Sequence, residues 1–590
     1  MAIQLASGYR GYRDLLVTYL RPQRGRVALL AVLLLGDIVL QLVNPQILRF
    51  FIDTARRGGT ASALANAAVL FLAVVVVTQV VSSVATYLSE DVGWTATNGL
   101  RADLTLHCLR LDPSFHKAHP PGELIERVDG DTAVLATFFS AFVIRVLGNG
   151  LLLAGILALI AREDWRVGLA LLAYSGVALE ALRRARRLPA RSFASFRQAS
   201  ADLSGFWEEH LMGTEDIRAN GAVAYVLGRQ NGLSRALLRH GRANLVLGRA
   251  FLSVLEVFTA VGGALAFALG AYLLSAGAMT VGAVFLVFFY TSLLSARLGE
   301  LTTQLNTLQS AGVGIARIKD LYDTRTATPD GPGAALPSGP PALRFEGVSF
   351  GYDGESEALA LRDLSFDLPP GRVLGVLGRT GSGKTTLARL VTRLYDPRAG
   401  VIRLGGVDLR DLRLADLRRR VGLVTQDVQL FGATVRDNLT LFAQGVADER
   451  ILRALADLSL MEWYESLPRG LDTEIAAGAL SAGQAQLLAL ARVFLRDPDL
   501  IVLDEASSRL DPATERLLER AIDRLFAGRS AIVIAHRLAT VQRADDILVL
   551  DGGRAVEYGP RMALAADPAS HYARLLRIGL ETPDTREAPV

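Results

Sequence analysis

The first half of the chain contains six long apolar runs separated by more polar segments. Runs such as AVLFLAVVVV have no polar face, which argues against the buried helices of a large soluble bundle. Most of the runs reach the ~20 residues that a helix needs to cross a bilayer. The pattern therefore predicts six transmembrane helices, at residues 26–52, 63–88, 138–161, 165–181, 251–275 and 280–296.

The intervals between these runs alternate between very short and very long, which predicts three helical hairpins. The long intervals, 89–137 and 182–250, contain charged, helix-forming residues and few helix breakers, so we expect helical extensions there. Together with the N-terminal segment they carry most arginines of this half, and the positive-inside rule places them in the cytoplasm. A few arginines on the opposite side weaken this asymmetry: Arg56, Arg57, Arg162 and Arg166.

A segment rich in proline and glycine, TRTATPDGPGAALPSGPP, follows the apolar half and is typical of a linker. Beyond it, short β-type runs such as VLGVLG and LIVLDE alternate with amphipathic helical segments, as in an α/β domain. The predicted fold is an α-helical six-span transmembrane domain followed by an α/β domain. The expected boundaries are 1–323 for the transmembrane domain, 324–341 for the linker, 342–575 for the α/β domain and 576–590 for a tail.

Composition agrees with a membrane protein. With 51% hydrophobic residues and a mean hydropathy of +0.31, the 590 residues are too apolar for an ordinary soluble enzyme. The formal net charge of +4 is small for this length and gives nucleic-acid binding no support. Cys108 is the single cysteine, so no internal disulfide forms. The first apolar run is too long for the core of a signal peptide, so we expect it to stay in the membrane.

The α/β domain contains a phosphate-binding motif, GRTGSGKT, between the strand VLGVLG and the helical run KTTLARLVTRLY. Glycines let backbone amides close around phosphates, Lys384 can reach the outer phosphates, and the Thr385 hydroxyl can bind Mg²⁺. The second domain is therefore expected to be an α/β P-loop ATPase domain that uses ATP and Mg²⁺. The candidate ATP-binding residues here are Gly378, Arg379, Thr380, Gly381, Ser382, Gly383, Lys384, Thr385 and Thr386.

Polar residues at the ends of other predicted strands can complete a γ-phosphate site. Asp504 and Glu505 end the run LIVLDE, where Asp504 would hold Mg²⁺ through water and Glu505 would polarise the attacking water. Gln426 follows another strand and His536 ends a third. Each of these residues alone is more often an ordinary surface residue, but together after a phosphate loop they predict a catalytic site.

A second potential phosphate site is the stretch ALSAGQAQLLALARVF. Ser481 and Gln484 have the spacing of a capping box, in which each side chain satisfies a free amide of the first helical turn. Free amides at a helix N-terminus also bind phosphates. The residues alone leave both interpretations open.

These motifs together resemble the nucleotide-binding domain of an ABC transporter, and LSAGQ looks like the LSGGQ signature of that family. The six-span half with its two long cytoplasmic intervals resembles an ABC exporter of the type IV fold. The resemblance implies that Tyr352 stacks on adenine and that Gln426 is the Q-loop residue and a metal ligand. It also implies that Glu505 is the catalytic carboxylate, that His536 is the switch histidine and that Asp511 belongs to the D loop. Thr385 and Asp504 complete the expected metal ligands.

In the family, the signature binds the ATP held by the other subunit. Ser481, Ala482, Gly483 and Gln484 are therefore expected to act in trans, in a dimer with a second half-transporter at the inner (plasma) membrane. Ala482 replaces the usual glycine, Arg509 replaces the usual alanine of the D loop, and the segment before the signature is about two residues short. These departures favour a heterodimer over a homodimer, with this chain supplying the competent Walker motifs and glutamate.

The expected function is ATP-driven transport, most readily export, of an amphipathic or hydrophobic small molecule, lipid or peptide. Two alternatives are an importer built on the exporter fold, as in metal-chelate uptake, and a non-transporting membrane ATPase or regulator. A scaffold with a decayed ATPase is disfavoured because the hydrolytic residues are all present.

Ionisable residues inside the spans are candidates for the substrate path, because they usually face a cavity or a partner. They are Asp37, Arg145 and Glu256, although Asp37 and Arg145 could simply neutralise each other. Phe285 and Phe289 share a helix face, which more often means packing than a binding wall. The tips of the long intervals, at 111–128 and 210–222, are expected to dock on nucleotide domains, and family resemblance assigns the second tip to the partner's domain.

Overall fold

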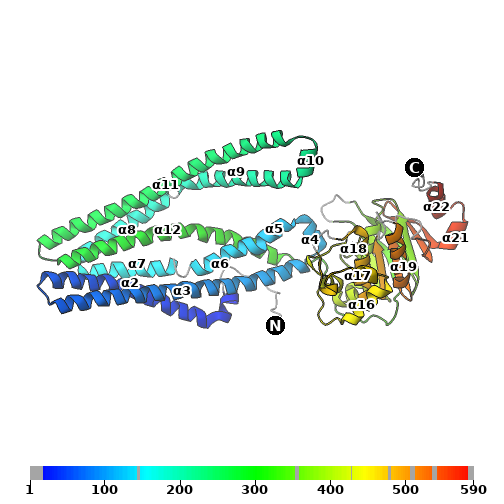
Figure 1. Cartoon of the computed structure of the whole chain (residues 1–590), viewed down its shortest axis with the longest axis horizontal. Helices are drawn as coiled ribbons and strands as arrows, with labels where there is room; N and C mark the ends of the chain where they lie inside the picture. The colour runs from blue at the N-terminus through cyan, green and yellow to red at the C-terminus, as the bar shows by residue number, and fades with distance from the viewer. Residues whose placement is uncertain are drawn as a thin grey trace. The chain divides into compact units, whose positions relative to one another are not determined.

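The computed structural model describes residues 17–141, 146–185, 187–352, 358–426, 428–475, 480–504, 512–534 and 541–581. The chain divides into two compact units (Figure 1). The first comprises Met1–Leu109 and Pro121–Thr324, and the second comprises Arg110–Pro120 and Arg325–Val590. The short loop segment Arg110–Pro120 thus belongs with the second unit, although it lies far from the rest of that unit in the sequence.

The first unit is helical, and six of its helices are long and apolar enough to cross a membrane, as predicted. Several continue well past the predicted spans, because the long intervals contain few helix breakers: α3 has 50 residues, α11 has 53 and α12 has 43. The helices of this unit are η1 (Arg21–Gln23), α2 (Arg24–Arg56), α3 (Ala61–Arg110), α5 (Pro121–Ile125), η2 (Glu126–Gly130), α6 (Asp131–Ala141), α7 (Asn149–Glu163), α8 (Trp165–Ala185), α9 (Arg187–Met212), α10 (Thr214–Ala219), α11 (Val223–Ser275) and α12 (Val281–Asp323).

The second unit contains a six-stranded sheet in the order β12-β11-β3-β10-β9-β6, a four-stranded sheet β2-β1-β4-β5 and a pair β7-β8. Its strands are β1 (Leu343–Phe350), β2 (Leu361–Leu368), β3 (Val373–Gly378), β4 (Ala399–Leu404), β5 (Val407–Asp408), β6 (Val421–Val424), β7 (Ala433–Thr434), β8 (Glu474–Ile475), β9 (Leu500–Asp504), β10 (Ser530–Ile534), β11 (Asp546–Asp551) and β12 (Arg554–Pro560). Its helices are α4 (Pro113–Ala118), α13 (Lys384–Val391), η4 (Leu409–Asp411), α14 (Leu414–Arg420), α15 (Val435–Thr440), α16 (Asp448–Asp457), α17 (Met461–Glu465), η5 (Gly470–Asp472), α18 (Ala482–Arg496), α19 (Pro512–Phe526), α21 (Arg561–Ala566) and α22 (His571–Glu581).

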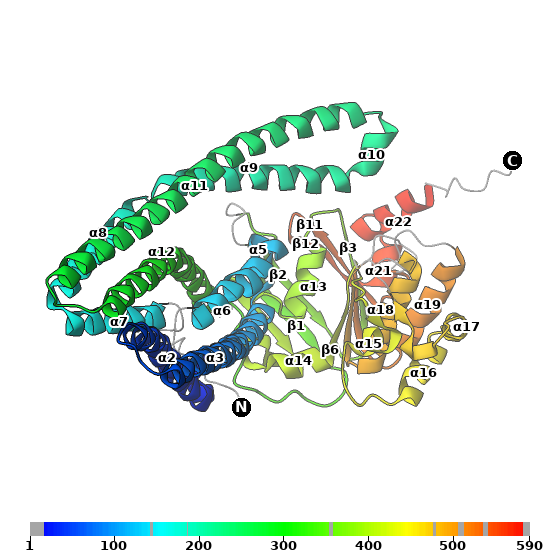
Figure 2. The same ribbon diagram turned by 60° about the vertical axis from the view of Figure 1, so that its left-hand side comes forward.

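The central strands of the six-stranded sheet are buried on both faces. Along β9, Leu500 and Val502 belong to a core with α13 and the smaller sheet, whereas Ile501 and Leu503 pack in a core with α18 and α19. Figure 2 shows these helices on opposite sides of the sheet. Burial on both faces explains the continuous apolar run LIVL, because a strand with one solvent-exposed face would alternate apolar and polar residues.

The loop segment Arg110–Pro120 is held to the linker by one buried carboxylate. Asp112 accepts hydrogen bonds from the Thr326 hydroxyl at 2.9 Å, the Thr328 hydroxyl at 2.5 Å and the Ala327 amide. Burial raises the pKa of Asp112, but these hydrogen bonds outweigh burial and lower its pKa below the usual value. The start of the Pro/Gly-rich linker is therefore fixed to this loop of the second unit.

A second carboxylate joins helices at the ends of the membrane spans. Asp53, in the last turn of α2, accepts hydrogen bonds from the Thr280 hydroxyl at 2.7 Å and the Gly282 amide at 2.9 Å. A negative charge there satisfies free amides at the N-terminus of α12. Arg49 on α2 forms an ion pair with Glu163 at the end of α7. Three helices thus meet at one polar cluster.

We predict that Gly282→Ala destabilises the protein. A Cβ at position 282 would lie 2.6 Å from the Arg49 carbonyl oxygen and 2.7 Å from Asp53 Cγ. Overpacking of this kind costs about 1–3 kcal/mol. Thermal unfolding in detergent should show a lower Tm for Gly282→Ala than for Gly36→Ala, whose Cβ would meet no described atom within 4 Å. Equal Tm values would show that α2 and α12 separate easily at this point.

We also predict a pH-dependent loss of stability in Asp112→Asn. The pKa of Asp112 is lowered in the folded state. The stability that Asp112 contributes is therefore fully present above the usual pKa of about 4, and it is lost as the pH falls through the folded pKa. An amide offers one acceptor oxygen instead of two, so we expect a loss of about 1–2 kcal/mol at pH 7. The Tm difference from wild type should be constant from pH 8 to 5.5 and narrow below pH 4. Asp551→Asn, at an exposed position, should show no difference.

Candidate functional site

The phosphate-binding motif forms a tight loop between β3 and α13. Gly381 has φ +83° and Gly383 has φ +103°, conformations that favour glycine. A Cβ on Gly383 would also lie 2.6 Å from the Leu361 side chain. The loop therefore needs glycine at position 383 for both backbone conformation and space.

Polar groups in this loop fit the phosphates of a nucleotide. The Lys384 ammonium is turned into the loop, where it donates to the carbonyl oxygens of Gly378 at 2.7 Å and Arg379 at 3.1 Å. The buried Ser382 hydroxyl oxygen has no hydrogen-bond partner among the described residues. A buried hydroxyl without a partner is costly, and a phosphate oxygen would satisfy it. The loop thus has both a cation and an unused donor for an anionic ligand.

Oxygen ligands suited to Mg²⁺ lie where the first turn of α13 meets the end of β9. The Thr385 hydroxyl donates to Asp504 Oδ1 over 3.5 Å, and Asp504 is buried. A hydroxyl and a carboxylate are ligands that Mg²⁺ accepts, so these two residues fit the predicted metal site. Gln426 is exposed and follows β6, the neighbour of β9.

The two remaining strand ends lie side by side. Asp504 and Ile534, the last residues of β9 and β10, are register partners in parallel strands. Glu505 and His536 follow these strands in the sequence and lie outside the described residues, as do Arg509 and Asp511. Their predicted roles therefore remain sequence-based.

Tyr352 lies beside the phosphate loop. Its hydroxyl is 3.1 Å from the Thr386 hydroxyl and accepts a hydrogen bond from Arg389 at 2.9 Å. The Lys117 ammonium, from α4, lies 5.6 Å from the centre of the Tyr352 ring, within range of a cation–π interaction. Sequence analysis assigned no role to Lys117 or Arg389. The sequence offered one indication that Lys117 has a specific role: it is one of only three lysines in an arginine-rich chain.

The signature segment forms a capped helix start. The Ser481 hydroxyl accepts from the Gln484 amide at 3.2 Å, and the Gln484 side chain accepts from the Ser481 amide at 3.1 Å. The predicted capping box is confirmed. Ala482 is the first residue of α18, where φ is negative, so alanine causes no backbone strain. Ser481 and Ala482 are exposed, whereas Gly483 is buried.

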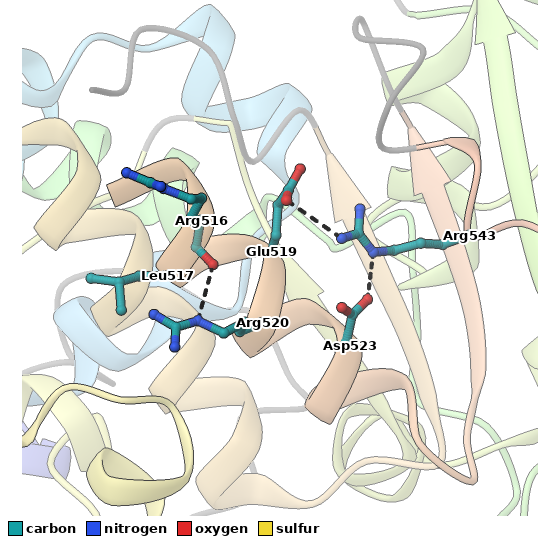
Figure 3. A pocket seen from close by; sticks show the side chains of 6 residues that line it. All are labelled: Arg516, Leu517, Glu519, Arg520, Asp523 and Arg543. Carbon is teal, nitrogen blue, oxygen red and sulfur yellow. Dashed lines mark hydrogen bonds and ion pairs between the residues drawn. The ribbon is translucent and has the colours of Figure 1, made fainter. Parts of the chain in front are cut away.

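A surface hollow of about 640 Å³ lies elsewhere, along α19 (Figure 3). Arg543 forms ion pairs across it with Glu519 and Asp523. None of the candidate nucleotide residues that the structure describes contributes to its lining, so we do not assign the hollow to the ATP site. Its lining residues are Arg516, Leu517, Glu519, Arg520, Asp523 and Arg543.

The predicted substrate-path residues that the structure describes have different surroundings. Asp37 accepts a hydrogen bond from Gln41 at 2.6 Å, whereas Glu256 is exposed and pairs with Arg249 at 3.1 Å. Arg145 lies outside the described residues. Phe285 and Phe289 are 36% and 38% exposed, so neither is fully used in packing within the chain.

Arg297 is a residue near Asp37 that sequence analysis missed. Its guanidinium donates to Gln41, the residue that also contacts Asp37. The sixth apolar run was predicted to end at residue 296, so Arg297 was not counted among the ionisable residues inside the spans. The continuation of α12 to Asp323 is what places Arg297 inside a long helix.

Known proteins match both halves of this chain. Residues 27–298 match the family model described as ABC transporter transmembrane region, and residues 361–508 match the one described as ABC transporter. The chain is 31% identical to the ATP-dependent lipid A-core flippase of Haemophilus influenzae, over 79% of this chain and 80% of that protein. It is 34% identical to the multidrug efflux ATP-binding/permease protein of Mycobacterium bovis, over 95% of this chain but 47% of that protein.

A solved structure described as a bacterial Atm1-family ABC exporter with ATP bound is also similar. It has a TM-score of 0.77 and 25% identity, covering 96% of this chain and 99% of that one. These matches establish ATP-driven transport and ATPase activity in a multi-pass protein of the bacterial inner membrane, with a cytoplasmic ABC domain. The resemblance expected from the sequence is confirmed: the chain belongs to the ABC transporter family, as a half-transporter with the type IV exporter fold.

Proposed function

We propose that this half-transporter exports an amphipathic compound, using ATP bound between itself and a second half-transporter. One observation supports the shared site: the same chain contains a phosphate loop and a second, exposed helix start at Ser481. Within one chain the phosphate loop and the signature serve different nucleotides, so two chains together complete two sites. Export is supported by the names of the relatives, a lipid flippase and a multidrug efflux protein.

In this proposal each group of the site has one task. The loop amides and Lys384 hold the outer phosphates, and Ser382 donates its unused hydroxyl to one of them. Thr385 and Asp504 would hold Mg²⁺, which supplies positive charge against the charge that develops on the phosphates. Glu505 orients and polarises the attacking water, and Gln426 and His536 contact the γ-phosphate end. Tyr352 stacks on adenine after releasing its hydrogen bond to Thr386.

Transport into inside-out membrane vesicles tests the direction. Export from the cytoplasm corresponds to ATP-dependent uptake into such vesicles, and import corresponds to ATP-dependent release. Uptake that requires ATP and an intact Lys384 would support export. Release of a preloaded compound on addition of ATP would instead identify an importer.

We predict that Glu505→Gln binds ATP but hydrolyses it at least 100-fold more slowly than wild type. The amide keeps the size of the side chain but loses the charge that polarises water, and a general base contributes about 10²–10⁴-fold. Single-turnover hydrolysis and nucleotide occupancy should be measured together. Glu449→Gln, on the exposed start of α16, is the matched control and should match wild type. Hydrolysis within a few-fold of wild type would place the competent glutamate in the partner.

A second prediction concerns the tip formed by α9, α10 and α11, which Figure 1 shows as a long hairpin. Leu211 is 74% exposed and Met212 is 85% exposed, so the tip presents apolar side chains suited to docking. We expect it to contact the partner's nucleotide domain near the segment after Gln426.

The test uses two differently tagged chains in which Cys108 is replaced by serine. One chain carries Glu215→Cys and the other Gln429→Cys. Oxidation should give a covalent dimer, whereas Arg453→Cys on α16 in place of Gln429→Cys should give none. A third chain carries both Glu215→Cys and Gln429→Cys. If only this chain crosslinks, and does so internally, the tip docks on its own nucleotide domain and the swapped arrangement is wrong.

A further inference from the structure

The first two membrane helices, α2 and α3, pack together at one end and leave a hollow between them at the other. Near the cytoplasmic side, Leu30 and Leu34 of α2 form an apolar cluster with Ala85 of α3. Towards the turn that joins the two helices, they line an open hollow of about 490 Å³ instead. The chain therefore leaves a space between its own helices within the apolar part of the hairpin.

This hollow lies towards the outer surface of the membrane. The cytoplasmic ABC domain follows α12, so the beginning of α12 is at the outer side. Asp53, near the end of α2, accepts hydrogen bonds from Thr280 and Gly282 at the beginning of α12. The end of α2 and the turn after it are therefore also at the outer side, in contact with the outer leaflet.

The lining of the hollow is mainly apolar. Ile47 and Phe50 contribute from α2, and Ala63, Ala67 and Leu70 contribute from α3. Phe50 is 56% exposed and Leu70 is 53% exposed, so the hollow is open to its surroundings. In a bilayer the surroundings are hydrocarbon, and an empty space would lose dispersion contacts on every side. An acyl chain fits a hollow of this kind, because the few polar groups there offer water little hydrogen bonding.

Two unpaired guanidinium groups lie at the mouth of the hollow. Arg56 and Arg57 are exposed, and neither side chain forms an ion pair or a hydrogen bond with any residue that the structure describes. Arg57 follows Phe50 by two helical turns, so its side chain starts from the same side of α2, ~10 Å further out. Arginine at this position can reach the phosphate of a lipid whose tail lies beside Phe50.

An amide lies between the apolar lining and the arginines. Asn66 lines the hollow ~7.5 Å from the start of α3 at Ala61, near the depth where headgroups give way to hydrocarbon. Its side chain has no hydrogen-bond partner among the described residues, whereas Gln46, the other amide of the lining, donates to the Tyr290 hydroxyl at 3.2 Å. Asn66 can therefore donate to an ester carbonyl of a glycerolipid.

The charge at the mouth favours a lipid with net negative charge. Asp53 is the nearest carboxylate in the sequence, and both of its oxygens already accept hydrogen bonds from α12. The positive charge of Arg56 and Arg57 is therefore not neutralised by a described ion pair. A zwitterionic headgroup would bring an ammonium group towards these guanidiniums, whereas an anionic headgroup brings only opposite charge.

We propose that the hollow between α2 and α3 is a binding site for an anionic phospholipid of the outer leaflet. The acyl chain lies along Phe50, Ala67 and Leu70, Asn66 bonds the ester region, and Arg57 binds the phosphate with Arg56 beside it. The lipid is a bound component of the transporter and is separate from its cargo, so the proposal does not depend on the direction of transport.

The test compares two lipids with the same tails, dioleoylphosphatidylglycerol and dioleoylphosphatidylcholine. The full-length protein, assembled with its partner subunit, is delipidated in detergent without ATP and titrated with each lipid. Native mass spectrometry counts the bound lipid, and thermal unfolding gives the change in Tm. We expect phosphatidylglycerol to bind more tightly and to raise the Tm more. Added salt should reduce this preference, because exposed charges are screened.

Three variants locate the site. Arg57→Gln should weaken the affinity for phosphatidylglycerol about 5-fold, as expected for one arginine near an anionic headgroup. Ala67→Phe should fill the hollow and abolish tight binding of this lipid. Arg162→Gln is the matched control, because Arg162 is an exposed arginine near the outer end of α7 that does not line the hollow. It should bind the lipid as wild type does. Arg57→Gln changes an exposed residue, so it keeps the test decisive if Ala67→Phe fails to fold.

Equal affinity for the two lipids, or unchanged affinity for phosphatidylglycerol in either Arg57→Gln or Ala67→Phe, would overturn the proposal. Coverage of the hollow by the partner subunit would also overturn it. In that case Asn66→Cys, in a chain with Cys108→Ser, would react with a membrane-permeant maleimide in the isolated chain but not in the assembled dimer. Failure of the export proposal would leave all of these binding results unchanged.

Discussion

The parallel pairing of β3, β10 and β9 is the constraint on which the ATP site depends. These strands are buried on both faces, so their chemistry is confined to their ends. Their shared direction brings the phosphate loop after Gly378, the buried carboxylate of Asp504 and the end of β10 to one edge of the sheet. Any change that shifts the register of β9 would move Asp504 away from Thr385, and the expected metal ligands would separate without any change in their identity.

Two half-buried carboxylates in the membrane unit use their acceptor oxygens in different ways. Asp53 accepts hydrogen bonds at both oxygens and caps α12, so it has little capacity left for a ligand. Asp37 uses one oxygen, and the other stays buried without a described partner. The difference lies in how many acceptor sites the surrounding helices satisfy.

Much of the fold followed from local patterns. The six apolar helices, the phosphate loop and the capping box depend on short-range periodicity and spacing, and the sequence alone predicted them. The helical extensions of α3 and α11 were also expected, because helix-forming residues continue where the apolar runs end. The continuation of α12 to Asp323 was not expected. The contacts of Lys117 with Tyr352 and of Arg297 with Gln41 join segments far apart in the sequence, so no local pattern indicated them. Glu505, His536 and Arg145 lie outside the described residues and stay predictions.

The tie between Asp112 and Thr326–Thr328 bears on how modular this protein is. Contiguous sequence from the linker onward does not contain the whole ATPase unit, because Arg110–Pro120 belongs to it. A fragment beginning at Arg325 would leave the amide of Ala327 and the hydroxyls of two threonines without their acceptor. The ATPase half therefore cannot be exchanged as one contiguous segment of sequence. A gene fusion that grafted it onto a foreign set of membrane helices would also have to bring along a compatible first loop, which constrains recombination between such genes.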